Sequence, residues 1–242
     1  MNSAIVLMYH NIAVPPSGKD TIGLCVSPGM FRFQMWYLKA AGFRVVPLND
    51  IADFINGRSV HKKIVALTFD DGYQDFYENA YPILSAYKFP STVFIVTDLA
   101  GKENAWDYKD VNVRKSLMGW ETIHRLKGEG VTFGAHTRTH PFLSRLSPDS
   151  ARDEICNSKL QLEEQLQLPV DFFCYPYGNY DSKTIAAVKH AGYKLAVTTR
   201  RGLVHKGDNI FEVRRSFIRT HTNPFLFLCR LHSPYEDWKK SI

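Results

Sequence analysis

Short apolar runs alternate with longer amphipathic stretches along most of this chain. The run Ile64–Phe69 lacks the polar alternation of a half-exposed strand, which is typical of parallel strands covered on both faces. Similar runs recur with room for a helix between them. The expected strands are Ala4–Tyr9, Arg44–Val46, Ile64–Phe69, Thr92–Val96, Thr132–Ala135, Phe172–Tyr175, Leu195–Thr198 and Glu212–Ile218.

The stretches between these runs carry helix signals. Pro28–Ala41 begins with Ser27 as an N-cap and ends at Gly42, and Pro148–Leu166 has Ser147 as its N-cap. Pro82 predicts that the helix within Tyr73–Tyr87 begins near Asn79. The remaining expected helices are Asp50–Asn56, Trp120–Gly128, Ser182–Ala191 and Pro224–Leu231.

The alternation of strands and helices predicts an α/β fold. Parallel strands need a crossover between them, and a helix is the usual crossover. About seven strands over this length suit either a closed (β/α) barrel or an open doubly wound sheet. The chain has no repeat and no linker-like stretch, so we expect one domain over residues 1–242.

Composition narrows the class of protein. With 45% hydrophobic and 22% charged residues among 242, the chain resembles an average globular protein. A chain of this size can bury a core without a metal, so any metal site would serve function. Its four cysteines form no CxxC pair, which favours reduced thiols over a zinc–thiolate site.

Net charge and the N-terminal sequence indicate which partners and which location to expect for the protein. The formal charge of +6 is scattered along the chain, so we expect no nucleic-acid partner. No apolar run reaches the roughly 18–20 residues of a membrane helix. The N-terminus lacks a basic region and a long apolar run, which predicts a cytoplasmic protein.

Two adjacent carboxylates follow the strand Ile64–Phe69. Asp70 and Asp71 precede Gly72, which permits a sharp turn out of the strand. Two buried carboxylates repel each other, and a bound cation would offset that repulsion. A solvated turn is the alternative interpretation, because Asp-Gly pairs are common in turns.

Two histidines follow the strand Thr132–Ala135. His136 and His140 have the spacing at which two imidazoles can converge on one ion, although Pro141 excludes a long helix there. One of the nearby aspartates would complete a set of two histidines and one carboxylate. Such a set leaves coordination positions open for water and substrate, and therefore suits catalysis.

Two further strands also end in polar residues or in residues with special backbone properties. The first strand ends at His10, and Phe172–Tyr175 continues into Pro176-Tyr177-Gly178. The carboxyl ends of barrel strands meet at one rim, where functional residues of barrels lie. Four strands thus predict one shared site.

The three motifs Thr68-Phe-Asp-Asp-Gly72, His136-Thr-Arg-Thr-His140 and Tyr175-Pro-Tyr-Gly178 together resemble those of the polysaccharide deacetylase family, the NodB-homology or carbohydrate esterase family 4 group. The resemblance runs from about Ile5 to about Ile218 and includes Trp120-Glu121. It implies a distorted (β/α) barrel of about seven parallel strands. It also implies removal of acetyl groups from sugars with the help of zinc or another divalent ion.

The resemblance assigns a role to each motif residue. It makes Asp70 the catalytic base, and it makes Asp71, His136 and His140 the ligands of one divalent ion, for which zinc is the expected metal. The backbone N–H of Tyr177 would help to hold the oxyanion.

Two departures from the family pattern leave roles open. Where many members have an arginine that orients the base, this chain has Cys174, and Arg214 or Arg215 could substitute for it. The usual C-terminal histidine that serves as the acid is also unclear. Val6-Leu-Met-Tyr-His10 resembles the branch related to poly-N-acetylglucosamine deacetylases, in which the histidine is N-terminal, so we expect His10 as the acid, with His232 and His221 as alternatives.

The expected activity is metal-dependent hydrolysis of the acetamido group of an N-acetylated saccharide to acetate and a free amine. An O-acetyl sugar esterase is a close alternative, because the oxygen of an ester leaves more readily than the nitrogen of an amide and so needs the acid less. A catalytically weak carbohydrate-binding module is another, since the family's usual fourth motif, with its tryptophan, is not visible and its C-terminal motif is not matched. The sequence leaves the sugar, the metal and the oligomeric state open.

Overall fold

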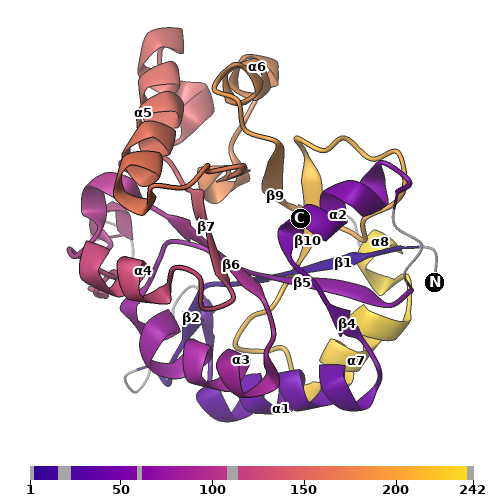
Figure 1. Cartoon of the computed structure of the whole chain (residues 1–242). Helices are drawn as coiled ribbons and strands as arrows, with labels where there is room; N and C mark the ends of the chain where they lie inside the picture. Colours follow the sequence, from indigo (N-terminus) through magenta and orange to yellow (C-terminus); the bar gives the residue numbers. More distant parts are fainter. Residues whose placement is uncertain (1–2, 16–22, 59–61, 108–113, 239–242) are drawn as a thin grey trace.

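Seven parallel strands close into a barrel in the computed structural model, which describes residues 3–15, 23–58, 62–107 and 114–238 (Figure 1). The sheet runs β1-β10-β9-β8-β7-β6-β5, and β1 also pairs with β5, with Ile5 opposite Val65. The expected (β/α) barrel is therefore confirmed. Its strands are β1 (Ile5–Tyr9), β5 (Ile64–Phe69), β6 (Ser91–Ile95), β7 (Val131–Ala135), β8 (Phe172–Cys174), β9 (Leu195–Arg201) and β10 (Val213–Phe217).

Three short strands lie outside this closed ring. β4 (Arg44–Val45) pairs with β5 on the outside, and β2 (Asn11–Ile12) pairs with β3 (Cys25–Val26) beside the barrel. β2 continues the chain directly after β1. It therefore belongs to the same rim as the residues that follow the barrel strands.

Helices surround the strands (Figure 1). They are α1 (Pro28–Ala40), α2 (Leu48–Ile55), α3 (Tyr81–Tyr87), α4 (Trp120–Leu126), α5 (Pro148–Leu166), α6 (Ser182–His190), α7 (Pro224–His232) and α8 (Tyr235–Trp238). Ser27 and Ser147 cap α1 and α5 as the sequence predicts, each accepting a hydrogen bond from a backbone N–H of the first turn. Within the described ranges, no helix has the length and apolar character needed to span a bilayer.

Beyond the short elements β2, β3 and α8, which the sequence did not predict, two predicted segments differ in the structure. Instead of a plain helix beginning near Asn79, the chain forms a π-helical turn over Phe76–Ala80 that leads into α3. Pro82 has no N–H to donate to the preceding turn, so a continuous α-helix is not available there. β9 extends past Thr198 to Arg201, where its residues become exposed and no apolar pattern marks the strand.

The barrel interior is apolar at its amino-terminal end. Val6, Ala66, Phe94, Phe172 and Val197 come from five different strands and pack into one cluster, which side chains of α2 join. The alternate residues of the same strands face outward and form a second cluster with the surrounding helices.

One strand position must remain without a side chain for this interior packing. A Cβ at Gly134 would lie 2.6 Å from the ring of Phe94 and 2.9 Å from the carbonyl oxygen of Phe172. Glycine at this position therefore makes room for the Phe94 ring inside the barrel.

The carboxyl-terminal end of the interior holds a buried ion pair. Arg215 on β10 has no solvent exposure, and its two terminal nitrogens donate hydrogen bonds of 2.7 Å to the two carboxylate oxygens of Asp70. It also donates to the Thr198 carbonyl and the Thr68 hydroxyl. Asp70 itself is only 2% exposed. Each charge thus depends on the other for compensation.

Breaking this pair from one side should destabilise the barrel. We expect Arg215→Met to lower the free energy of unfolding by about 3–5 kcal/mol, because it leaves a buried carboxylate uncompensated. The double variant Asp70→Asn with Arg215→Met should recover part of that loss. Arg214→Met is the control, since the half-buried pair of Arg214 with Asp208 should contribute about 0–1 kcal/mol. Urea unfolding measures all four proteins, and an Arg215→Met variant as stable as the control would contradict the prediction.

Candidate active site

A cavity of about 480 Å³ lies at the carboxyl ends of the barrel strands. Its lining includes every site residue that the sequence predicts: His10, Asp70, Asp71, His136, His140 and Tyr177. These residues follow β1, β5, β7 and β8. Parallel closure of the barrel brings the ends of those strands to one rim, so residues far apart in the sequence share one cavity.

Asp71, His136 and His140 form a compact set of potential metal ligands. Asp71 Oδ1 lies 3.3 Å from His136 Nε2 and 3.4 Å from His140 Nε2. One ligand atom from each residue lies within 4.8 Å of the other two, and all three residues are buried. Two imidazole nitrogens and one carboxylate oxygen are the donor set of many catalytic zinc sites. The set therefore fits a divalent ion.

A hydrogen bond on the side of the ring away from Asp71 fixes the orientation of His136. Its Nδ1 lies 2.7 Å from the carbonyl oxygen of Cys174 at the end of β8. A carbonyl oxygen can only accept a hydrogen bond, so Nδ1 carries a proton, and Nε2 is the nitrogen that faces Asp71. This arrangement of a second hydrogen bond behind the ligand is common to metal-binding histidines.

Burial and charge determine the protonation of the other two members. Burial lowers the pKa of His140 to about 3, against the opposing charge of Asp71, so its imidazole is neutral at neutral pH. Burial alone would raise the pKa of Asp71, but the hydrogen bond with His136 is the main cause that outweighs burial and holds the pKa below its usual range. A neutral imidazole and an ionised carboxylate are the forms that bind metals.

A second combination of potential ligands is less suitable. Asp70, His136 and Cys174 also lie close together. However, both oxygens of Asp70 accept hydrogen bonds from Arg215, and Cys174 Sγ lies 3.2 Å from Arg215 Nη2. A cationic guanidinium at that position excludes a metal ion from the same space, so the set around Asp71 fits better.

Of the two arginines that could substitute for the family's arginine, Arg215 is the one that contacts Asp70. The structure brings Arg215 to Asp70, whereas Arg214 forms ion pairs with Asp208 at 3.1 Å and Asp237 at 3.6 Å on another side. Burial alone would raise the pKa of Asp70, but the charge and hydrogen bonds of Arg215 outweigh burial and lower it. Asp70 is therefore ionised at neutral pH and can accept a proton.

His10 lies on the other side of Asp70. Its Nε2 is 3.8 Å from Asp70 Oδ2, and its ring packs against Phe217 with the centroids 5.2 Å apart. Its Nδ1 is buried and has no hydrogen-bond partner among the described residues. Burial lowers the pKa of His10, and the charges of Asp70 and Asp71 partly oppose that shift.

The two alternative histidines lie elsewhere. His232 ends α7 on the outside of the barrel, where its Nε2 is 2.8 Å from the hydroxyl of Tyr37 and its ring packs on Phe43. His221 is an exposed residue in the turn before α7. Neither residue lines the cavity that contains His10.

Tyr177 holds an unusual backbone conformation beside the ligand set. Its φ of 57° lies in the left-handed region, and the following Gly178 has φ +65°. A Cβ at Gly178 would come within 1.8 Å of the Thr199 hydroxyl, so glycine is required there. The Tyr177 ring lies flat on Phe142 with centroids 4.0 Å apart and meets the edge of His140 at 4.4 Å.

Trp106 lies near a motif loop in the sequence and was not among the predicted site residues, but it is one in the structure. Its ring stacks on His140 with the centroids 4.5 Å apart, and it lines the same cavity. Aromatic residues near motif loops are as common in cores as in sites, so its position in the sequence carried no signal of its own.

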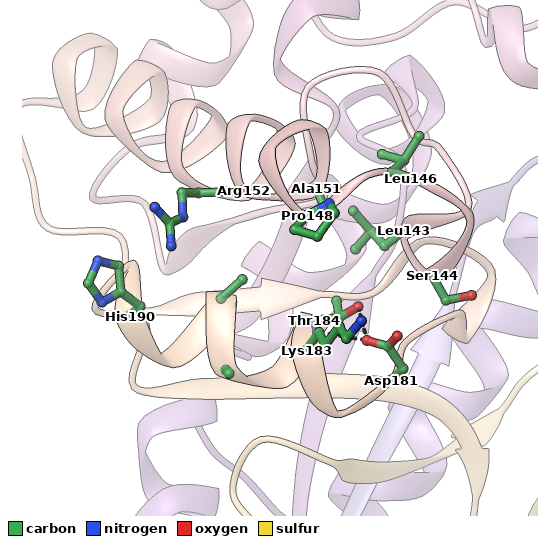
Figure 2. A pocket seen from close by; sticks show the side chains of 12 residues that line it. Leu143, Ser144, Leu146, Pro148, Ala151, Arg152, Asp181, Lys183, Thr184 and His190 are labelled. Atoms are coloured by element: carbon green, nitrogen blue, oxygen red, sulfur yellow. Dashed lines mark hydrogen bonds between the residues drawn. The ribbon is translucent and has the colours of Figure 1, made fainter.

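A second cavity of about 480 Å³ lies between α5 and α6 (Figure 2). Leu146 and Ala151 line it together with the basic Arg152 and Lys183, and Asp181 is engaged as the cap of α6, accepting from Thr184. None of the ligand or carboxylate residues of the barrel rim reaches this cavity. The candidate chemistry therefore belongs to the cavity at the strand ends.

Comparison with known proteins agrees with this geometry. Over 230 residues, the chain is 26% identical to a poly-beta-1,6-N-acetyl-D-glucosamine N-deacetylase of Staphylococcus aureus, covering 90% of this chain and 79% of that protein.

Two solved structures have a closely similar fold. The Streptococcus pyogenes deacetylase PplD, solved in complex with acetate, matches with a TM-score of 0.82 and 30% identity over 95% of this chain and 98% of that one. IcaB from Ammonifex degensii matches with a TM-score of 0.83 and 26% identity over 96% and 98% of the two chains.

A family model described as polysaccharide deacetylase matches residues 57–196, which is more than half of the chain. This match spans all three motifs, so the resemblance drawn from them is confirmed. The expected class of enzyme, a hydrolase, is confirmed with it. The buried Asp70, the ligand set around Asp71 and the barrel that carries them thus belong to a member of the polysaccharide deacetylase family.

Proposed function

We propose that this chain is a metal-dependent deacetylase that hydrolyses the acetamido group of an N-acetylated saccharide. The observation that carries the proposal is the pairing, in one cavity, of an ionised buried carboxylate with a ligand set of two histidines and one aspartate. The name of the S. aureus relative supports an N-acetylated sugar polymer as the substrate class. The products would be acetate and a free amine.

Asp71, His136 and His140 would hold the ion, and we propose zinc. Their nitrogen and carboxylate donors suit zinc, and the carbonyl of Cys174 orients the first histidine toward the ion. Such an ion would polarise the acetyl carbonyl and make a neighbouring water molecule more acidic.

Asp70 would act as the general base. Arg215 keeps its carboxylate ionised and fixes both oxygens in place, so it can take a proton from the attacking water. The water oxygen then forms a bond to the acetyl carbon, and the carbonyl oxygen gains negative charge. The backbone N–H of Tyr177, a residue that lines the cavity, would stabilise this oxyanion.

His10 would act as the general acid for the leaving nitrogen. An amide anion is a very poor leaving group, so the carbon–nitrogen bond breaks only when the nitrogen receives a proton. Asp70 Oδ2 lies 3.8 Å from His10 Nε2, which gives the proton taken from water a short route to His10. The bond then breaks, and acetate and the amine leave.

An O-acetyl esterase would need His10 less, because an alcohol leaves more easily than an amine. The same cavity could bind either acetyl group, so the distinction depends on the contribution of His10. A weak carbohydrate-binding module has no specific observation in its favour, since Arg215 donates hydrogen bonds to the Asp70 carboxylate and His10 lies 3.8 Å from it, as a hydrolase would need.

The function is tested by measuring acetate released from a β-1,6-linked N-acetylglucosamine oligomer. We expect release by the zinc-loaded protein, loss after a chelator removes the metal, and recovery when zinc is restored. The bound zinc should measure one ion per chain. A fully zinc-loaded protein that releases no acetate from this or another N-acetylated oligosaccharide would contradict the proposal, as would full activity without metal.

The role of His10 is tested by comparing an amide with an activated ester. His10→Ala should slow acetate release from the oligomer by about 10²–10⁴-fold, the usual effect of removing an acid or base. Hydrolysis of p-nitrophenyl acetate should fall much less, because nitrophenolate leaves without a proton. His232→Ala is the matched control, since His232 lies outside the barrel, and both its rates should stay near wild type. Equal losses for the two substrates would assign His10 to positioning instead.

A further inference from the structure

The segment between the two histidines of the ligand set holds a strained backbone. Thr137 has φ 65° and His140 has φ 64°, in a region that side-chain-bearing residues rarely adopt. Each such residue costs about 1–3 kcal/mol, so neighbouring groups must fix the segment for it to persist. The same backbone determines where the two imidazoles point.

Glu154 on α5 supplies the contacts that fix the middle of this segment. One carboxylate oxygen accepts hydrogen bonds from the backbone nitrogens of Arg138 at 2.8 Å and Thr139 at 3.0 Å. The other accepts one from the Thr139 hydroxyl at 2.6 Å. Three donors of two adjacent residues thus converge on one side chain.

The opposite face of the segment is fixed as well. The carbonyl oxygens of Thr137 and Arg138 accept hydrogen bonds from the backbone nitrogens of Thr97 and Asp98, at 3.1 and 3.0 Å. The Arg138 guanidinium also pairs with Asp98 at 2.9 Å and with Asp153 on α5. The segment is therefore held between α5 and the residues after β6, and Glu154 provides the only charged acceptor for its backbone nitrogens among the described residues.

We propose that Glu154 is a positioning residue for the metal-binding histidines, acting through the backbone of residues 136–140. This inference rests on the ligand set of the proposed function. Without the carboxylate, two backbone N–H groups would lose their partners, and the strained conformation would lose the contacts that offset its cost. The imidazole of His140 would then no longer be held 3.4 Å from Asp71 Oδ1.

The first test is zinc affinity, measured by competition with a chromophoric chelator. Glu154→Gln replaces the charged acceptor with a neutral amide, whose oxygen accepts more weakly from the two backbone nitrogens, and zinc binding should weaken by about 10–100-fold, the usual effect of losing a partner behind a metal ligand. At saturating zinc, acetate release should return to within a few-fold of wild type. Glu164→Gln is the control, because it makes the same charge change at an exposed position of the same helix.

The second test needs no metal. Amide hydrogen exchange of residues 136–140 in the metal-free protein should be faster in Glu154→Gln than in wild type and in the control. A wild type that binds no zinc would refute the proposed metal site, and exchange would still decide whether Glu154 fixes the segment.

A milder variant covers the case in which Glu154→Gln does not fold. Thr139→Val removes only the hydroxyl donor, so zinc binding should weaken by a smaller factor than in Glu154→Gln. A folded Glu154→Gln with unchanged zinc affinity and unchanged exchange would overturn the proposal. A lower rate at saturating zinc with unchanged affinity would overturn it too, because it would give Glu154 a part in the chemistry.

Discussion

The two carboxylate oxygens of Asp70 meet the guanidinium of Arg215 inside the barrel, where Arg215 is fully buried and Asp70 is only 2% exposed. This ion pair links the packing of the interior to the chemistry of the rim. A lone buried carboxylate would take up a proton to escape its desolvation cost, and Asp70 would then be useless as a base. With Arg215 behind it, Asp70 stays ionised beside a second aspartate, and His10 and the ligand set around Asp71 take positions on either side of it.

The rim combines this fixed charge with strained backbone. Four residues with side chains adopt left-handed φ angles there: Asp71, Thr137, His140 and Tyr177. These conformations lie in the segments that follow β5, β7 and β8, and Asp71, His140 and Tyr177 line the cavity. Hydrogen bonds from α5 and from the loop after β6 offset the strain at the histidine segment. The helices around the barrel thus contribute to the site as well as to the core.

Much of this arrangement was predictable from the sequence because parallel strands impose simple geometry. Apolar runs that end in His10, Asp70 or His136 must bring those residues to one rim. The choice between Arg214 and Arg215 was harder, since a charged side chain at a buried strand position departs from the usual burial of apolar residues; in the structure Val213 and Arg215 are buried inside the barrel, and Arg214 between them is not. Glu154 was equally hidden, because an acidic residue on a half-exposed helix face resembles ordinary solvated surface.

The central claim is that Asp70 accepts a proton and does not bind the metal. Asp70→Asn, loaded with zinc, tests it most directly when bound zinc and acetate release are measured on the same preparation. The account predicts one zinc per chain, as in wild type, with acetate release slower by about 10²–10⁴-fold. Near-normal acetate release in a zinc-loaded Asp70→Asn would place the base elsewhere, and loss of the zinc itself would make Asp70 a ligand.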